Sequence, residues 1–179
     1  MNFEYETALI EAILFLETDP IDAPTLARIS GFSVDVVLEV LAKLQERYES
    51  TQSGLSIDEI AGGFILTPRT DLWNDLKGRY GKKNDNNLSR AALETLSVIA
   101  YSQPVTRAEI ESIRGVSPDG MIRLLLAKDL IKPVGKKDTP GRPIQYGTTS
   151  DFLKVFRLAS IADLPRLDEL NEERFSIEE

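Results

Sequence analysis

ALIEAILFLETDPIDAPTLARISGFS, residues 8–33, aligns without a gap on ALETLSVIAYSQPVTRAEIESIRGVS, residues 92–117. The matching positions include a proline followed by a hydrophobic residue, a glycine and a serine: Pro20-Ile21 on Pro104-Val105, Gly31 on Gly115, and Ser33 on Ser117. Self-similarity of this kind indicates a repeated structural unit. We therefore predict two copies of one plan: helix, turn, helix, glycine, helix.

In the first copy, hydrophobic residues recur at helical spacing, at Leu9, Ile13 and Leu16. Asp19 precedes a proline and so ends this helix, because such a residue avoids the helical region. Asp22 is the expected cap of the second helix, and Gly31 its end. Ser33 is expected to cap the third helix. Its apolar stripe consists of Val37, Leu41, Leu44 and Tyr48.

Two β-prone runs, residues 55–57 and 64–66, flank Gly62-Gly63 and predict a hairpin. Residues 70–79 predict a helix that closes this domain with its apolar side chains, Leu72, Trp73 and Leu76. In the second copy, residues 131–135 and 144–148 predict the equivalent hairpin. A last helix opening at Ser150 or Asp151 should face the core with Phe152, Val155 and Phe156.

The helices of the second copy carry clear boundary signals. Ser89 should cap a helix whose apolar side is Leu93, Leu96 and Ile99. Thr106 and Glu109 are three residues apart and predict a capping box for the next helix, which ends at Gly115. Ser117 is the expected cap of the third helix, with Pro118 at its first position.

Three helices followed by a two-stranded wing are typical of the winged-helix plan. The predicted fold class is mainly α with small β-hairpin wings (α+β), as two tandem winged helix-turn-helix domains. We expect the domains to span residues 1–80 and 88–163. The polar stretch 81–87, GKKNDNN, is the predicted linker. Residues 164–179 form an acidic tail that we expect to be flexible.

The chain has no cysteine and no histidine, which removes disulfides, thiolate metal sites and the commonest general base. It also has no phosphate-binding loop, nucleotide fingerprint or nucleophile beside a base. We therefore expect no enzyme activity, no cofactor and no metal. The start of the chain is acidic and no apolar run could cross a bilayer, so we expect a cytoplasmic protein.

Charge is unevenly distributed. Residues 1–80 hold 14 acidic and 6 basic residues, a net charge of −8, whereas residues 81–163 hold 9 acidic and 13 basic, a net charge of +4. Residues 164–179 hold 6 acidic and 2 basic, a net charge of −4. Neither third helix has the positive excess expected of a DNA reader. A winged-helix DNA-binding transcriptional regulator remains the alternative, because the second domain is weakly basic.

Surplus apolar residues point to protein partners. Leu124, Leu125 and Leu126 are consecutive and span about 200° of a helix, more than one core stripe needs. The first helix has a similar surplus around Leu14 and Phe15, with Phe3 before it. Alternatively, the wing and the closing helix cover both faces. Apolar surface beyond the needs of the core marks a binding site.

The second wing carries Lys136, Lys137 and Arg142 on a loop that contains Pro140, Gly141 and Pro143. One interpretation is a rigid turn without further role. The other is that the three cations are presented to an acidic partner or to phosphate.

Several stretches of the second copy resemble the second domain of the bacterial segregation and condensation protein B family. They are residues 88–96 (LSRAALETL), 99–110 (IAYSQPVTRAEI), 113–117 (IRGVS), 141–143 with 146–149 (GRP and YGTT), and 163–165 (DLP). The first domain is similar to that family in its layout and around residues 10–15 (IEAILF). Ser102 departs from the family, which more often has a basic or a different polar residue there.

The resemblance implies a non-catalytic subunit of the bacterial SMC complex, associated with the nucleoid. It implies a homodimer formed chiefly through the first domain, and binding of the kleisin, segregation and condensation protein A, largely by the second. The SMC ATPase would be reached through the kleisin, and DNA through the assembled complex. The candidate kleisin-binding residues are Leu124, Leu125, Leu126, Arg142 and Tyr146. The candidate dimer contacts are Phe3, Leu14 and Phe15, and the candidate phosphate contacts are Lys136, Lys137 and Arg142.

Overall fold

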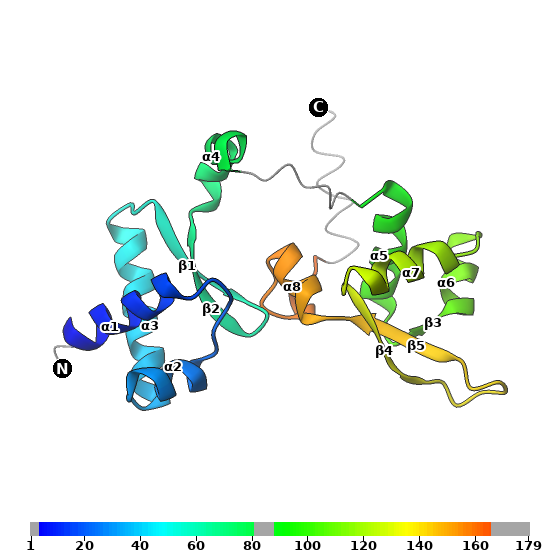
Figure 1. Ribbon diagram of the computed structural model, residues 1–179, viewed down its shortest axis with the longest axis horizontal. Coiled ribbons are helices and arrows are strands. Elements are labelled where there is room, and N and C mark those ends of the chain that lie inside the picture. The colour runs from blue at the N-terminus through cyan, green and yellow to red at the C-terminus, as the bar shows by residue number, and fades with distance from the viewer. Residues whose placement is uncertain (1–3, 81–87, 166–179) are drawn as a thin grey trace.

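The two sequence repeats fold into two similar domains (Figure 1). The computed structural model describes residues 4–80 and 88–165. The first domain contains α1 (Glu4–Leu16), α2 (Ala23–Ser30), α3 (Val34–Ser50), β1 (Leu55–Ile60), β2 (Gly63–Pro68), the 3-10 turn η1 (Thr70–Leu72) and α4 (Trp73–Tyr80). The second contains α5 (Arg90–Ser102), β3 (Val105–Thr106), α6 (Arg107–Arg114), α7 (Asp119–Ala127), β4 (Ile131–Lys136), β5 (Ile144–Thr148), α8 (Ser150–Phe156) and the 3-10 turn η2 (Ile161–Asp163). The architecture is therefore mainly helical, with a small antiparallel sheet in each winged-helix domain.

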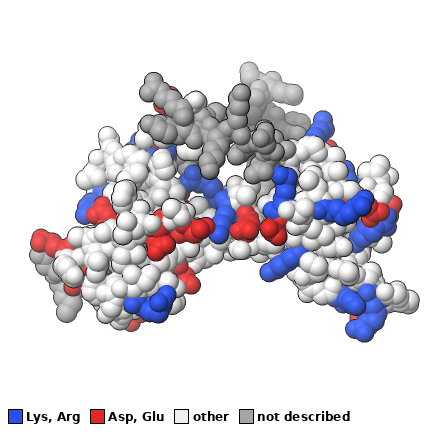
Figure 2. Space-filling model, in the orientation of Figure 1, with Lys and Arg blue, Asp and Glu red and all other residues white. Residues whose placement is uncertain are grey.

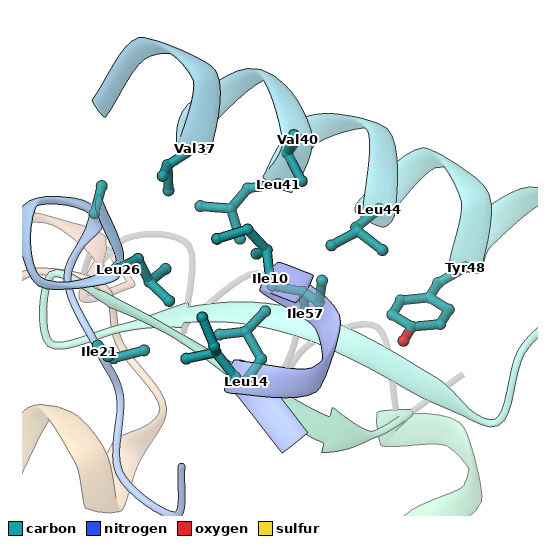
Figure 3. Packing of buried hydrophobic residues seen from close by; sticks show 12 residues of the cluster. Ile10, Leu14, Ile21, Leu26, Val37, Val40, Leu41, Leu44, Tyr48 and Ile57 are labelled. Carbon is teal, nitrogen blue, oxygen red and sulfur yellow. The ribbon is translucent and has the colours of Figure 1, made fainter. Parts of the chain in front are cut away.

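The core of the first domain forms along α3, as predicted (Figure 3). All four residues of the expected α3 stripe are buried there. The residues of α1 that face this core are Ile10, Ile13 and Leu14, and Leu16 is exposed. The prediction that Leu16 points inward was wrong. Because α1 is apolar on more than one side, its spacing alone could not identify the buried side.

Helix boundaries follow the capping signals closely. The Asp22 carboxylate accepts the backbone N–H of Thr25 at 2.7 Å, and Gly31 ends α2 with φ of 77°. Thr106 and Glu109 form the predicted capping box of α6. These features confirm the predicted starts and ends of α2 and α6.

The start of α7 differs from the prediction. This helix begins at Asp119, with Pro118 at the cap position and no side-chain cap bond. The Ser117 hydroxyl instead donates to the Asp119 carboxylate at 3.2 Å. That carboxylate also binds Arg107. The Ser117 hydroxyl therefore binds the Asp119 side chain and does not cap the helix.

The proline turn between the first two helices forms part of each wing. Ile21 and Phe64 exchange two backbone hydrogen bonds, of 3.0 and 2.8 Å. A Cβ atom on Gly63 would lie 2.9 Å from the Ile21 backbone nitrogen, so only glycine allows this approach. In the second domain, Val105 pairs with Tyr146 in the same way. The turn thus adds a third strand or bridge to both hairpins.

The last helix of each domain buries fewer of its apolar side chains than the sequence suggested. Phe152 of α8 lies in the second core, but Val155 is 63% exposed and Phe156 is also exposed. Phe156 instead packs on the Phe152 ring, with centroids 4.7 Å apart. In the first domain, η1 and α4 occupy the predicted helical region. Trp73 is exposed and α4 extends away from the core, so α4 does not close the domain (Figure 1).

We expect two leucines on α5 to differ sharply in their effect on stability. Leu96 is 2% exposed and Leu93 is 42% exposed. Leu96→Ala should lower the free energy of unfolding by about 2–5 kcal/mol, since it leaves a cavity in the second core. Leu93→Ala is the matched control and should change it by less than about 1 kcal/mol. Urea denaturation followed by circular dichroism measures both, and equal losses would contradict the assigned core.

Candidate binding surfaces

The outer face of α1 is an apolar surface in a strongly acidic domain. Tyr5, Phe15 and Leu16 are 70%, 74% and 76% exposed. At about 100° per residue, they share one side of the helix with two exposed alanines, Ala8 and Ala12. We call these five residues the α1 outer face. The opposite side of α1 is already in the core, so this helix is apolar nearly all round, as is typical of a helix covered on both sides.

The predicted dimer contacts fall in three different places. Phe15 lies on the α1 outer face. Leu14 is 1% exposed and packs in the core of its own domain (Figure 3), so its side chain is not available to a partner. This corrects the expectation for Leu14. Phe3 lies outside the described residues.

The leucine triple of α7 is largely occupied within its own domain. Leu125 is fully buried, and Leu126 is half-buried against the second core. Leu124 is half-buried, and on a helix it points about 100° away from Leu125. The expected broad apolar patch is therefore reduced to Leu124.

The second wing extends from the body of its domain, and Figure 2 shows Lys and Arg atoms gathered toward its end. Lys137 forms an ion pair with Glu109 at the start of α6, so its charge is compensated. Lys136 and Arg142 are exposed, as is Lys132. None of these three makes an ion pair with another residue of the described chain. The wing therefore presents uncompensated positive charge, and Lys132 is a member that sequence reasoning missed.

The end of the wing is held by backbone hydrogen bonds. The Arg142 N–H donates to the Thr139 carbonyl at 2.8 Å, and the Lys137 N–H donates to the Pro143 carbonyl at 2.9 Å. Gly141 and Arg142 both have positive φ, of 83° and 41°. A rigid turn is therefore present, and it is compatible with either interpretation of the charges. The remaining predicted contact, Tyr146, is half-buried against the second core.

The wing is also fixed to α6 by electrostatics, near the far end of its strands. The Glu109 carboxylate accepts hydrogen bonds from the Lys137 ammonium and from the N–H and hydroxyl of Thr106. These bonds, with Lys137 contributing most, lower the pKa of Glu109 to about 2. One carboxylate therefore caps a helix and holds the hairpin.

Another exposed apolar set lies on α5, on α6 and in the turn that follows α6. It comprises Leu93, Ile113 and Val116. A shallow pocket beside Ile113 is lined by Ser102, Pro104, Val105, Glu109 and Ser112. The expectation that Leu93 faces the core with Leu96 and Ile99 was wrong. Ile113 and Val116 gave no signal, because neither has an apolar side chain beside it in the sequence.

The described parts of the chain contain no cluster of three or more acidic residues placed to hold a metal ion. Within residues 4–80 and 88–165, no helix is long and apolar enough to cross a membrane. The features that stand out are apolar helix faces and one cationic hairpin on paired winged-helix units. The fold therefore places the chain in the class of tandem winged-helix proteins.

The chain belongs to the family of segregation and condensation complex subunit ScpB, whose model matches residues 8–167. Segregation and condensation protein B of Symbiobacterium thermophilum is 39% identical over 168 residues, which are 94% of this chain and 76% of that protein. The protein of the same name from Desulforamulus reducens is 41% identical over 160 residues, covering 89% and 88%. The crystal structure of ScpB from Mycobacterium tuberculosis is 30% identical, covers 87% of this chain and 97% of its own, and has a TM-score of 0.43.

The Glu109 cluster predicts a specific dependence of stability on pH. Because folding lowers this pKa, the carboxylate stabilises the protein above its ordinary pKa of 4.5. That contribution is lost as the pH falls from 4.5 toward about 2. Glu109→Gln should therefore lower Tm at pH 7, and the two melting curves should converge in acid. Glu46→Gln, on the exposed side of α3, is the control. A Tm difference for Glu109→Gln that persists unchanged to pH 2 would contradict the assigned cause.

Proposed function

We propose that this protein is a non-catalytic subunit of the bacterial SMC–kleisin complex, and that it acts in chromosome condensation and segregation. It dimerises through its first domain and binds the kleisin, segregation and condensation protein A, through its second. The kleisin links it to the SMC ATPase, and the protein is cytoplasmic and associated with the nucleoid. Membership of the ScpB family supports the complex. The observation that carries the dimer is the exposed α1 outer face.

The chemistry of the α1 outer face favours a second copy as its partner. In a two-fold dimer the same patch meets itself, so the patch must be self-complementary. Tyr5, Phe15 and Leu16 can pack against their own copies without placing like charges together. The surrounding domain is acidic, and a contact through any of its charged faces would repel a second copy. Interface cores are depleted of charged residues in the same way.

Charge on the α1 outer face should dissociate the dimer. Each large apolar side chain that is buried contributes about 1.5–3 kcal/mol. Phe15→Glu combined with Leu16→Glu should therefore raise the dimer Kd at least about a hundredfold. Size-exclusion chromatography with light scattering at micromolar concentration measures this. Val155→Glu, at a position of the second domain that is 63% exposed, should leave the dimer intact. If the parent protein is a monomer, or if the double variant still dimerises, the α1 outer face is not the dimer interface.

For the kleisin, the second domain offers an apolar side chain on α7 and an exposed cation on the wing. Leu124 is the member of the leucine triple that turns from the core, and Arg142 has no ion-pair partner among the described residues. An amphipathic helix of a partner binds to surfaces of this kind through its apolar side. Arg142, at the end of the wing, offers a separate contact for an acidic residue of the partner.

Replacing Leu124 by aspartate should weaken kleisin binding. Calorimetric titration of the purified kleisin into Leu124→Asp should show at least about a tenfold loss of affinity, with the Tm of the variant confirming that it is folded. Ile113→Asp, on the exposed side of α6, is the matched control. If Ile113→Asp loses binding and Leu124→Asp does not, the partner contacts α6 instead.

A second candidate function is contact of the second wing with DNA phosphate within the assembled complex. The observation that favours it is the set of exposed, uncompensated cations: Lys132, Lys136 and Arg142. The compensated charges of Lys137 and Arg107 argue against an independent DNA reader.

The wing predicts weak, salt-dependent binding to duplex DNA. Lys132→Glu combined with Lys136→Glu should abolish the binding seen in a gel-shift assay at low salt, since two phosphate contacts are lost. Arg28→Glu combined with Arg90→Glu changes the net charge equally and should retain it. No binding by the parent protein even at 50 mM salt would exclude this role for the isolated subunit.

A further inference from the structure

Helix α8 is shared between the two domains. Its Phe152 side chain is buried in the second core, which anchors the helix there. Its polar side chains reach the first domain, and Figure 1 shows α8 between that domain and the second wing. The Lys154 ammonium lies 3.0 Å from the Asp19 carboxylate, in the turn that follows α1. This contact raises the pKa of Lys154, so the ammonium stays charged.

Arg157, at the end of α8, contacts the first wing. Its guanidinium pairs with the Asp58 carboxylate of β1 and donates to the Thr67 hydroxyl of β2 at 3.0 Å. Thr67 also donates to Asp58, at 3.0 Å. Arg157 thus binds an acceptor site that spans both strands of the hairpin.

A backbone hydrogen bond completes the contact. The Ala61 N–H, at the tip of the first hairpin, donates to the Leu158 carbonyl at 2.8 Å. Leu158 itself packs against the second core. The first domain is therefore held at three separate places: the turn at Asp19, the strands at Asp58 and Thr67, and the hairpin tip at Ala61. Contacts at three separate places favour one orientation of the two domains.

The three contacts named above are polar: two ion pairs and a backbone hydrogen bond. The two core clusters of the described chain share no residue, so no common apolar core joins the domains. The side chains of Lys154, Arg157 and Asp19 are partly or largely exposed. Exposed ion pairs are individually weak and are screened by salt. Such a contact favours one orientation without making it permanent.

We propose that Arg157 and Lys154 form an electrostatic latch that docks the second domain on the first wing of the same chain. The latch is closed at low ionic strength and opens when salt screens it or when one charge is removed. Opening frees the first wing and α8 together and lets the domains reorient. The latch lies within one chain and requires no partner, so it is independent of the proposed kleisin and DNA contacts.

The absence of native cysteine makes the latch directly measurable. Glu46→Cys on α3 and Ser97→Cys on α5 are both exposed and can carry a donor and an acceptor dye. Labelled chains are diluted into excess unlabelled protein, so that energy transfer reports on one chain only. At 50 mM salt we expect one high-efficiency population, which shifts to lower efficiency at 500 mM.

Charge reversal isolates the Arg157 contact. Arg157→Glu or Asp58→Arg alone should lower the closed-to-open ratio roughly two- to fivefold, the range of an exposed ion pair. The double variant Arg157→Glu with Asp58→Arg should restore the parent ratio, which also shows that the chain is folded. Arg123→Glu, with the same change of charge elsewhere on the second domain, should have no effect.

Three results would overturn the latch. One is an efficiency that is unchanged in Arg157→Glu at both salt concentrations. Another is a double variant that stays open although its Tm matches the parent. The third is energy transfer that disappears on dilution with unlabelled protein, because the contact would then join two copies.

Discussion

The single apolar stripe of α3 determines the arrangement of the first domain. Val37, Leu41 and Leu44 occupy the centre of the core, and α1, α2 and the first hairpin pack around them. A unit of this size has one such core, and α1 can turn only one side toward it. The opposite side of α1 is apolar as well and stays outside. The surplus that we assign to assembly therefore arises from geometry: the helix has more apolar surface than its own domain can cover.

The two domains use the same fold with opposite electrostatics. The first carries a large negative charge and little compensation, which favours contact through its uncharged helix face. The second is weakly positive, yet most of its cations are tied to neighbouring carboxylates, as Arg107 is to Asp119 and Lys137 to Glu109. The charge that remains free is concentrated on the wing. Winged-helix domains often bind DNA, but the charges of these two domains favour the protein contacts that we propose. The second wing is the part whose charge is compatible with DNA.

Local signals predicted the fold well, because caps, glycine ends and proline turns act within a few residues. Asp22, Thr106 and Gly115 behave as the sequence indicated. The surfaces were harder to predict. Leu14 and Phe15 are adjacent, and only packing decides which of them is buried. Val155 is exposed although its spacing suggested otherwise, and the partner of Arg157 lies 99 residues away in the chain. Long-range contacts between polar residues leave no periodic trace in a sequence.

The bridge between Ile21 and Phe64 has a mechanical consequence. Asp19, which binds Lys154, lies three residues beyond Leu16 at the end of α1 and two before Ile21. Ile21 in turn is bonded to the hairpin that holds Arg157 through Asp58. A tilt of α1 caused by a contact at its outer face would therefore move Asp19, to which Lys154 of α8 is bound. The hairpin, which holds Arg157, would move less. We therefore expect a contact at the α1 outer face to influence the orientation of the two domains through the short segment between Leu16 and Ile21.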